Sequence, residues 1–174
     1  AIGLRDVHLN GYIHRDIKSP NVFIDGDLSD PIITIIDFGI SAQFDDSRTV
    51  NEATNRCFSS FYAPPEQRTH NEAKPSTDVF AVAAIGFELL VGTSSHPGGM
   101  DSRYAPQEYS KQSVSDDFNE VIRKATWDNP DHRYKIMDDF ILALRGKPLM
   151  IHMPRIIAEK AYPLEKDEYW ICRR

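Results

Sequence analysis

The chain has 174 residues, enough for one domain or for one domain with a tail. Hydrophobic residues make up 41% of it and charged residues 26%, which is typical of a globular protein and not of a disordered chain. With 20 Lys and Arg against 26 Asp and Glu, the net charge of -6 argues against a general affinity for nucleic-acid backbones or acidic membrane surfaces. We therefore expect neither nucleic acid nor membrane among the partners.

Cysteine usage and the apolar runs indicate a cytoplasmic protein. The two cysteines, Cys57 and Cys172, lie far apart and form neither a disulfide framework nor a zinc site. The longest apolar run, residues 79–87, is about half of the ~20 residues that a membrane-spanning helix needs. Charged residues appear as early as Arg5 and Asp6, so the start does not resemble a signal peptide. Because the chain begins with alanine and not methionine, we expect it to be a fragment.

Short strands and turns dominate the first forty residues. Asn10-Gly11 is a turn signal, and residues 12–14 and 22–24 read as short strands on either side of a polar loop. Residues 25–31 are rich in Asp, Gly, Ser and Pro and predict a hairpin connection. Residues 32–36 are isoleucines and a threonine, so they predict a buried strand.

The middle of the chain changes from a polar loop to a buried helix. Residues 40–62 lack a clean period and predict a long loop, and Pro64-Pro65-Glu66 predicts a turn. Ser76 is expected to cap a helix whose body, residues 79–91, is apolar nearly all round and ends at Gly92. Such a helix belongs in the middle of a helical core.

Two further helices are predicted after a second loop at residues 94–112. Residues 114–127 form an amphipathic pattern with Phe118, Val121, Ile122 and Ala125 on one face. After a turn at residues 128–131, residues 136–144 predict a helix closed by Gly146. We therefore predict an α+β fold, mainly α, in which small β-hairpins lie on a helical core. A boundary near residue 147 separates the domain, residues 1–147, from a tail, residues 148–174.

Three groups of residues have the composition of a phosphoryl-transfer site. The first is His14-Arg15-Asp16-Ile17-Lys18-Ser19-Pro20-Asn21, the second is Asp37-Phe38-Gly39, and the third is Tyr62-Ala63-Pro64-Pro65-Glu66. Transfer from ATP needs a carboxylate to orient the attacking hydroxyl, a cation near the transferred phosphate, and metal ions on the phosphates. Asp16 and Lys18 supply the first two, while Asn21 and Asp37 offer the oxygen ligands that Mg²⁺ prefers.

These groups, in this order and spacing, resemble the catalytic loop, the metal-binding motif and the end of the activation segment of protein kinases. The resemblance covers residues 4–144 and implies the C-terminal lobe of that fold, with ATP and Mg²⁺ as cofactors and protein Ser/Thr hydroxyls as substrate. It implies Asp16 as catalytic base, Lys18 as the cation beside the phosphate, and Asn21 and Asp37 as metal ligands. A lysine two residues after the base resembles serine/threonine kinases more than tyrosine kinases.

The resemblance also implies structural and regulatory residues. Asp78 matches the residue that anchors the catalytic-loop backbone, and Glu66 and Arg133 match a buried ion pair. Ser59 matches the residue that contacts the catalytic loop, and Phe38 and Gly39 complete the metal-binding motif. Arg15 implies control by phosphorylation, for which Thr54 is the predicted site, with Thr49 and Ser60 as alternatives. His14 is expected to be structural.

The sequence departs from the family pattern in three respects. The Gly-rich loop, the strand lysine and its partner glutamate belong before the catalytic loop, so we expect the N-terminal lobe to be missing and the fragment to be inactive alone. Phe58 and Ala83 stand where the family usually or often has glycine. In the tail, residues 162–174 resemble the first strands of a forkhead-associated domain, which would bind a phosphothreonine partner, although Cys172 replaces the usual glycine.

Other interpretations remain at this point. Asp16 and Asn21 also suit a plain turn, and Lys18 a solvated surface position. The other histidines, His8 among them, are isolated and typical of surface or cap positions. A pseudokinase or truncated scaffold without catalysis would retain the fold. A small-molecule kinase would share a related loop, but it has no evident use for the Pro64-Pro65-Glu66 segment or for Arg133.

Overall fold

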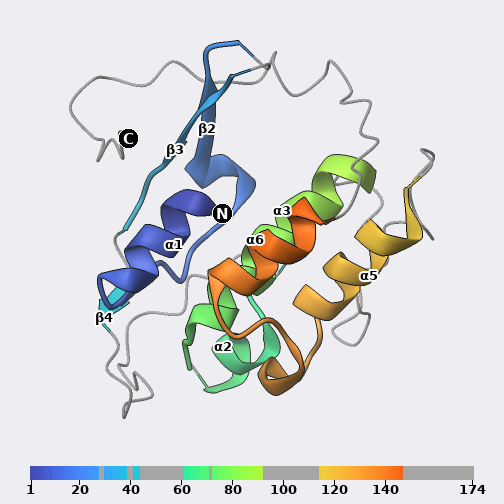
Figure 1. The fold of residues 1–174 in the computed structure, drawn as a ribbon. Helices are drawn as coiled ribbons and strands as arrows, with labels where there is room; N and C mark the ends of the chain where they lie inside the picture. The colour runs from blue at the N-terminus through green and yellow to red at the C-terminus, as the bar shows by residue number, and fades with distance from the viewer. Residues whose placement is uncertain (28–29, 39–40, 44–60, 71, 92–113, 147–174) are drawn as a thin grey trace.

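Two small antiparallel sheets lie beside a group of helices in the part of the chain that the computed structural model describes, residues 1–27, 30–38, 41–43, 61–70, 72–91 and 114–146 (Figure 1). β1 (Tyr12–Ile13) pairs with β4 (Ala42–Gln43), and β2 (Val22–Asp25) pairs with β3 (Ile32–Ile35). Consecutive strands β2 and β3 form the hairpin that the sequence predicts, in a register that places Val22 opposite Ile35.

A helix that the sequence analysis did not predict precedes the first strand. α1 (Ile2–Leu9) ends at Asn10, and Gly11 follows it with φ 78. The N–H of Gly11 donates to the carbonyl of His8 at 2.9 Å, which satisfies one of the last helical carbonyls. Only a residue without a Cβ adopts this left-handed turn at little cost, so the predicted turn at Asn10-Gly11 is confirmed as a helix end.

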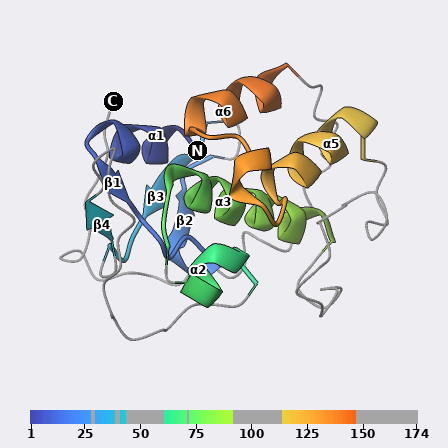
Figure 2. The same cartoon turned by 90° about the horizontal axis from the view of Figure 1, so that it is seen from below.

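α3 (Pro75–Val91) is the central helix, as its composition predicts. Val79, Ala83 and Ala84 are fully buried, and so is Phe87, one turn further on. Figure 2 shows α3 below α6 and beside α5, with the strands to one side. The helix starts at Pro75, not after Ser76, because proline fits the first helical position, where no N–H partner is needed.

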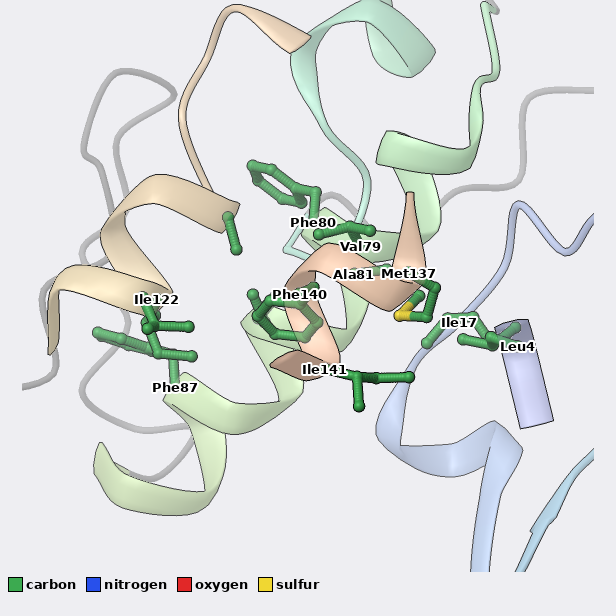
Figure 3. Packing of buried hydrophobic residues seen from close by; sticks show 14 of the residues in the cluster. Leu4, Ile17, Val79, Phe80, Ala81, Phe87, Ile122, Met137, Phe140 and Ile141 are labelled. Carbon is green, nitrogen blue, oxygen red and sulfur yellow. The ribbon is translucent and has the colours of Figure 1, made fainter. Parts of the chain in front are cut away.

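Two amphipathic helices cover α3. α5 (Asp116–Ala125) begins at Ser115, whose side chain accepts from the N–H of Phe118, and α6 (Met137–Arg145) ends at Gly146. The predicted apolar face of α5 is confirmed, because all four of its members are buried. Figure 3 shows the resulting core, to which α1, α3, α5 and α6 all contribute.

Short elements complete the fold. η1 (Ser19–Asn21) lies in the loop before β2, and η3 (Pro130–His132) forms the turn before α6. α2 (Pro65–His70) replaces the turn predicted at Pro64-Pro65-Glu66. The prediction was wrong because Pro65 begins a helix at this position and does not end one.

The prediction that residues 32–36 form a buried strand was wrong for its first half. Ile32 and Ile33 are 59% and 49% exposed, whereas Ile35 packs against the core. Ile32 pairs with Asp25 at the end of the hairpin that extends away from the helices (Figure 1). A β-branched run fits a strand on any surface, so composition alone did not show which part is covered.

No helix of the described residues is long and apolar enough to cross a membrane. The structure leaves undescribed most of the loop predicted at residues 40–62, the loop predicted at residues 94–112, and the tail. The predicted domain boundary and the resemblance of the tail therefore stay predictions.

A matched pair of leucines tests the packing of the unpredicted helix. Leu4 of α1 is 1% exposed, whereas Leu142 of α6 is 66% exposed. We expect Leu4→Ala to lower the free energy of unfolding by about 2–5 kcal/mol, because it removes buried methyl groups and leaves a cavity. Leu142→Ala is expected to change it by no more than about 0.5 kcal/mol. Urea denaturation of both variants checks this, and equal effects would mean that α1 does not pack as described.

Candidate active site

The chain topology brings the two chemical motifs together. The catalytic loop, residues 14–21, leads from β1 to β2, and the segment after β3 leads back to β4, the partner of β1. Both segments therefore pass between the same two sheets. The N–H of Ile36 donates to the carbonyl of Asn21 at 3.0 Å, which fixes Asp37 close to the end of the catalytic loop.

Asp16 is the point on which the polar groups of the loop converge. The ammonium of Lys18 donates to its Oδ2 at 2.6 Å. The Nδ2 of Asn21 donates to the same oxygen at 3.2 Å and to the main-chain carbonyl of Asp16 at 2.9 Å. The Asp16 side chain is 11% exposed, so a polar hydroxyl from outside can still reach it. The loop thus presents one carboxylate in contact with one cation and one amide.

The donor set suits a magnesium ion. The Asn21 side chain donates both of its bonds to Asp16 through Nδ2, so its Oδ1 is the atom that could act as a ligand. Asp37 adds a carboxylate from the neighbouring segment. One carboxylate and one amide oxygen leave room for phosphate oxygens and waters, which is how proteins usually hold Mg²⁺. Among the described residues, no group of three or more His, Cys, Asp or Glu side chains could hold a metal ion.

Asp78 of α3 holds the backbone at the start of the loop. Its Oδ2 accepts from the N–H of His14 and its Oδ1 from the N–H of Arg15, both at 2.9 Å. The Nε2 of His8 lies 2.8 Å from the same Oδ2. Asp78 is fully buried, so these donors replace the water that its carboxylate would otherwise bind.

Two residues of the site adopt left-handed backbone conformations. Arg15 has φ 72 and Asp37 has φ 63, values that cost energy for residues with a side chain. Arg15 is buried, and its carbonyl accepts from the Nε2 of Gln67 at 2.6 Å. With the bond to Asp78, both main-chain polar groups of Arg15 are paired, which offsets the strain. The role of Arg15 in phosphorylation control stays a prediction.

His14 joins the two motifs through its ring. Its Nε2 donates to the carbonyl of Ile36 at 3.1 Å, so Nδ1 is free to accept from the N–H of Asp16 at 3.4 Å. The ring lies 4.4 Å from that of Phe38, centroid to centroid. Burial lowers the pKa of His14, although Asp78 and the bond to Ile36 act in the opposite direction. The pattern of bonds is that of a neutral histidine.

Glu66 and Arg133 meet in a buried, two-point ion pair. Arg133 Nη1 and Nη2 donate to the two carboxylate oxygens of Glu66 at 2.7 and 2.8 Å. The Arg133 side chain is 0% exposed and also donates to the carbonyls of Trp127 and Asp128. The pair therefore ties α2 to the segment between α5 and α6.

The structure describes ten of the thirteen predicted site residues. Gly39, Thr54 and Ser59 lie outside the described residues, as does Phe58. The catalytic loop, Asp37, Phe38 and Asp78 lie together, whereas Glu66 and Arg133 form a separate ion pair that contacts Ser76 and Thr77 at the start of α3.

Sequence reasoning missed four contacts of the site. His8 was assigned to the surface or to a cap, but its side chain is 8% exposed and bonds to Asp78. Leu4, four residues earlier on α1, is buried, and this i,i+4 spacing places both on one face once the helix is known. Gln67 had no sequence signal. Neither had the contacts of Ser19 and Tyr62 with Glu88.

The pKa of His14 predicts a pH-dependent stability. Because this pKa is lower in the folded state than its ordinary value of 6.5, the unfolded chain takes up more protons as the pH falls below that value. His14 therefore supports the fold fully above pH 6.5 and less as the pH falls. We expect His14→Phe to lose about 1–3 kcal/mol at neutral pH, because the carbonyl of Ile36 loses its donor, and to show a shallower decline below pH 6.5. Urea denaturation across this pH range checks it, and parallel slopes for both proteins would contradict it.

Removing one partner of the buried ion pair is expected to be costly. Glu66→Ala leaves the charge of Arg133 buried and unpaired, for an expected loss of about 3–5 kcal/mol of unfolding free energy. Glu120→Ala is the matched control. Glu120 is 76% exposed and its ion pair with Arg123 is long, at 3.9 Å, so the free energy of unfolding is expected to change by less than about 1 kcal/mol. Chemical denaturation distinguishes the two, and a small effect of Glu66→Ala would mean that water reaches the pair.

Comparison with known proteins agrees with this arrangement. A family model described as the protein kinase domain matches residues 1–145. The chain is 27% identical over 154 residues to Serine/threonine-protein kinase PknB of Mycobacterium leprae, covering 81% of this chain and 24% of that protein. It is 30% identical over 141 residues to Serine/threonine-protein kinase PrkC of Bacillus subtilis, covering 76% of this chain and 21% of that protein. It is 30% identical over 182 residues to Cyclin-dependent kinase C-2 of Arabidopsis thaliana, covering 97% of this chain and 34% of that protein. It spans no more than 34% of the length of each of these relatives. Because the family model covers most of its residues, the chain belongs to the protein kinase family.

Proposed function

We propose that the protein transfers the γ-phosphoryl group of Mg-ATP to Ser or Thr hydroxyls of protein substrates. The observation that carries the proposal is the convergence of Lys18 and Asn21 on Asp16, beside Asp37. The lysine two residues after Asp16 and the names of two of the relatives support the Ser/Thr class.

Each group has one role in the proposed reaction. The carboxylate of Asp16 accepts a hydrogen bond from the substrate hydroxyl and orients it for attack. The Lys18 ammonium, already 2.6 Å from that carboxylate, lies where it neutralises charge on the transferred phosphate. Asn21 and Asp37 would hold Mg²⁺, which supplies the neutralisation of the phosphate oxygens when bound. Phosphoryl transfer depends mainly on such positioning and electrostatics.

The proposed activity needs parts of the kinase fold that these 174 residues do not supply. The Gly-rich loop, the strand lysine and the helical glutamate of the family are not among the residues before the catalytic loop. We propose that the 174-residue polypeptide binds Mg-ATP weakly and does not act alone. As a secondary proposal, which rests on sequence alone, residues 162–174 begin a forkhead-associated domain that would bind a phosphothreonine partner.

A substitution that keeps the shape of the proposed base but removes its charge tests the function. In a preparation that contains these residues and the rest of the kinase domain, we expect Asp16→Asn to lower kcat by about 10²–10⁴-fold, because the amide is a poor acceptor for the substrate proton. Transfer of radiolabelled phosphate to a Ser/Thr peptide measures this. Asp131→Asn is the matched control, since Asp131 is exposed and pairs only with the exposed Lys135 among the contacts described, so activity is expected to be unchanged.

The alternative is an interaction module without catalysis. If Asp16→Asn leaves phosphate transfer and the cellular phenotype of the complete protein unchanged, the scaffold function replaces the enzyme. Binding of Mg-nucleotide distinguishes the role of Asp37 from that of Asp16. Because Asp37→Asn removes a proposed metal ligand, it is expected to lower the affinity for Mg-nucleotide, whereas Asp16→Asn is not.

A further inference from the structure

Three side chains from three segments meet at a carboxylate that the proposed reaction does not use. Glu88 lies near the C-terminal end of α3, Tyr62 lies just before α2, and Ser19 is the first residue of η1 in the catalytic loop. The hydroxyl of Tyr62 donates to Glu88 Oε2 at 2.6 Å, and the hydroxyl of Ser19 donates to the same oxygen. We refer to Ser19, Tyr62 and Glu88 as the Glu88 cluster.

The hydrogens of the cluster can be assigned from its chemistry. Each hydroxyl has one proton, and an ionised carboxylate only accepts. The Tyr62 hydroxyl also lies 3.3 Å from the Ser19 oxygen, a longer and therefore weaker contact than its 2.6 Å bond to Glu88. All three side chains are partly buried, and hydrogen bonds to a charged acceptor are roughly twice as strong as neutral ones. Glu88 is therefore the hub of the cluster.

Ser19 occupies the point where the catalytic loop changes conformation. Lys18, just before it, has an extended backbone with φ -157 and ψ 159 and no side-chain cap, and the 3-10 turn begins at Ser19 and ends at Asn21. Of the two residues whose side chains contact Asp16, Lys18 thus precedes this turn and Asn21 is its last residue. A shift of the turn moves both relative to Asp16.

α3 consequently holds the catalytic loop at two places. Asp78 binds the main chain of His14 and Arg15 at one end of the loop, and Glu88 binds Ser19 near the other. The two carboxylates are ten residues apart on one helix, about 15 Å along its axis. Asp78 fixes the start of the loop, and in the part of the chain that the structure describes it is the bond of Ser19 to Glu88 that joins the turn at residues 18–21 to α3.

We propose that Ser19 is a positioning residue, which acts through Glu88 to hold Lys18 and Asn21 in register with Asp16. The proposal rests on the proposed kinase function. Ser19 itself touches neither substrate nor metal in this role. Tyr62 shares the same acceptor, so the segment before α2 is linked to the turn through one carboxylate.

The test compares two serine-to-alanine variants in the active preparation described above. Ser19→Ala is expected to lower kcat about tenfold with less than a twofold change in the KM for peptide, because misplacement of Lys18 affects the transition state more than binding. Ser19→Thr keeps the hydroxyl and is expected to restore most of the rate. Ser115→Ala removes the hydroxyl that caps α5, away from the loop, so it is expected to lower Tm and leave kcat unchanged.

A second measurement tests the cluster without any enzyme assay. The pKa of Tyr62 is raised to about 12, first by burial and then by its bond to Glu88. Glu88→Gln removes the negative charge, so the Tyr62 phenol is expected to ionise at lower pH. The phenolate absorbance of Glu88→Gln, with the matching Tyr62→Phe protein subtracted, measures this.

The outcomes are distinct. If Asp16→Asn abolishes phosphate transfer but Ser19→Ala only lowers Tm, as Ser115→Ala does, the positioning role is overturned and the proposed function remains. If Asp16→Asn has no effect, the proposed function fails and the positioning role fails with it. An unchanged phenol titration in Glu88→Gln would overturn the cluster in either case.

Discussion

The buried carboxylate of Asp78 is the constraint on which the site depends. A charge without water in the protein interior is strongly unfavourable unless donors surround it. Here two consecutive main-chain N–H groups, those of His14 and Arg15, supply the bonds, and the ring of His8 approaches the same side chain. The N–H groups of His14 and Arg15 reach this carboxylate with Arg15 in a left-handed backbone conformation. The hydrogen bonds that satisfy the Asp78 carboxylate thus also stabilise the strained backbone at the start of the loop.

Because Asp78 is part of α3, the loop inherits its position from the hydrophobic core. α3 is fixed by apolar contacts with α5 and α6. In its first turn, the carbonyl of Ser76 also accepts a hydrogen bond from Arg133, the partner of Glu66. A rigid helix therefore connects packing on one side to polar contacts on the other. Stability and site geometry are coupled in this arrangement, since loosening α3 would move the anchor of the loop.

Sequence patterns predicted the elements whose burial is periodic. The helix at residues 79–91 and the amphipathic face of α5 have enough apolar positions for the pattern to exceed chance, and the hairpin of β2 and β3 follows from its turn residues. α1 was missed because its only buried apolar side chain is Leu4, which gives no period to detect. The exposed half of β3 was missed because β-branched composition does not record what covers a strand. Local sequence patterns were sufficient to predict an element when the apolar residues of its buried face recur at regular spacing within it.

The contacts within the site are of a different kind. His8 and Asp78 are separated by 70 positions, and Ser19 and Glu88 by 69, so no spacing rule connects them. The motif residues were visible because Asp16, Asn21 and Asp37 follow a fixed order along short loops, and the topology then brings those loops together between the same two sheets. The bonds of His8 to Asp78 and of Ser19 to Glu88 gave no sequence signal, because hydrogen bonds to a carboxylate can come from any segment that the fold places nearby. The sequence thus identified the groups of the proposed chemistry and, through the family resemblance, the anchor Asp78, but it did not identify Glu88 or the contact of His8. Asp78 and Glu88 both belong to the helix with the strongest apolar pattern.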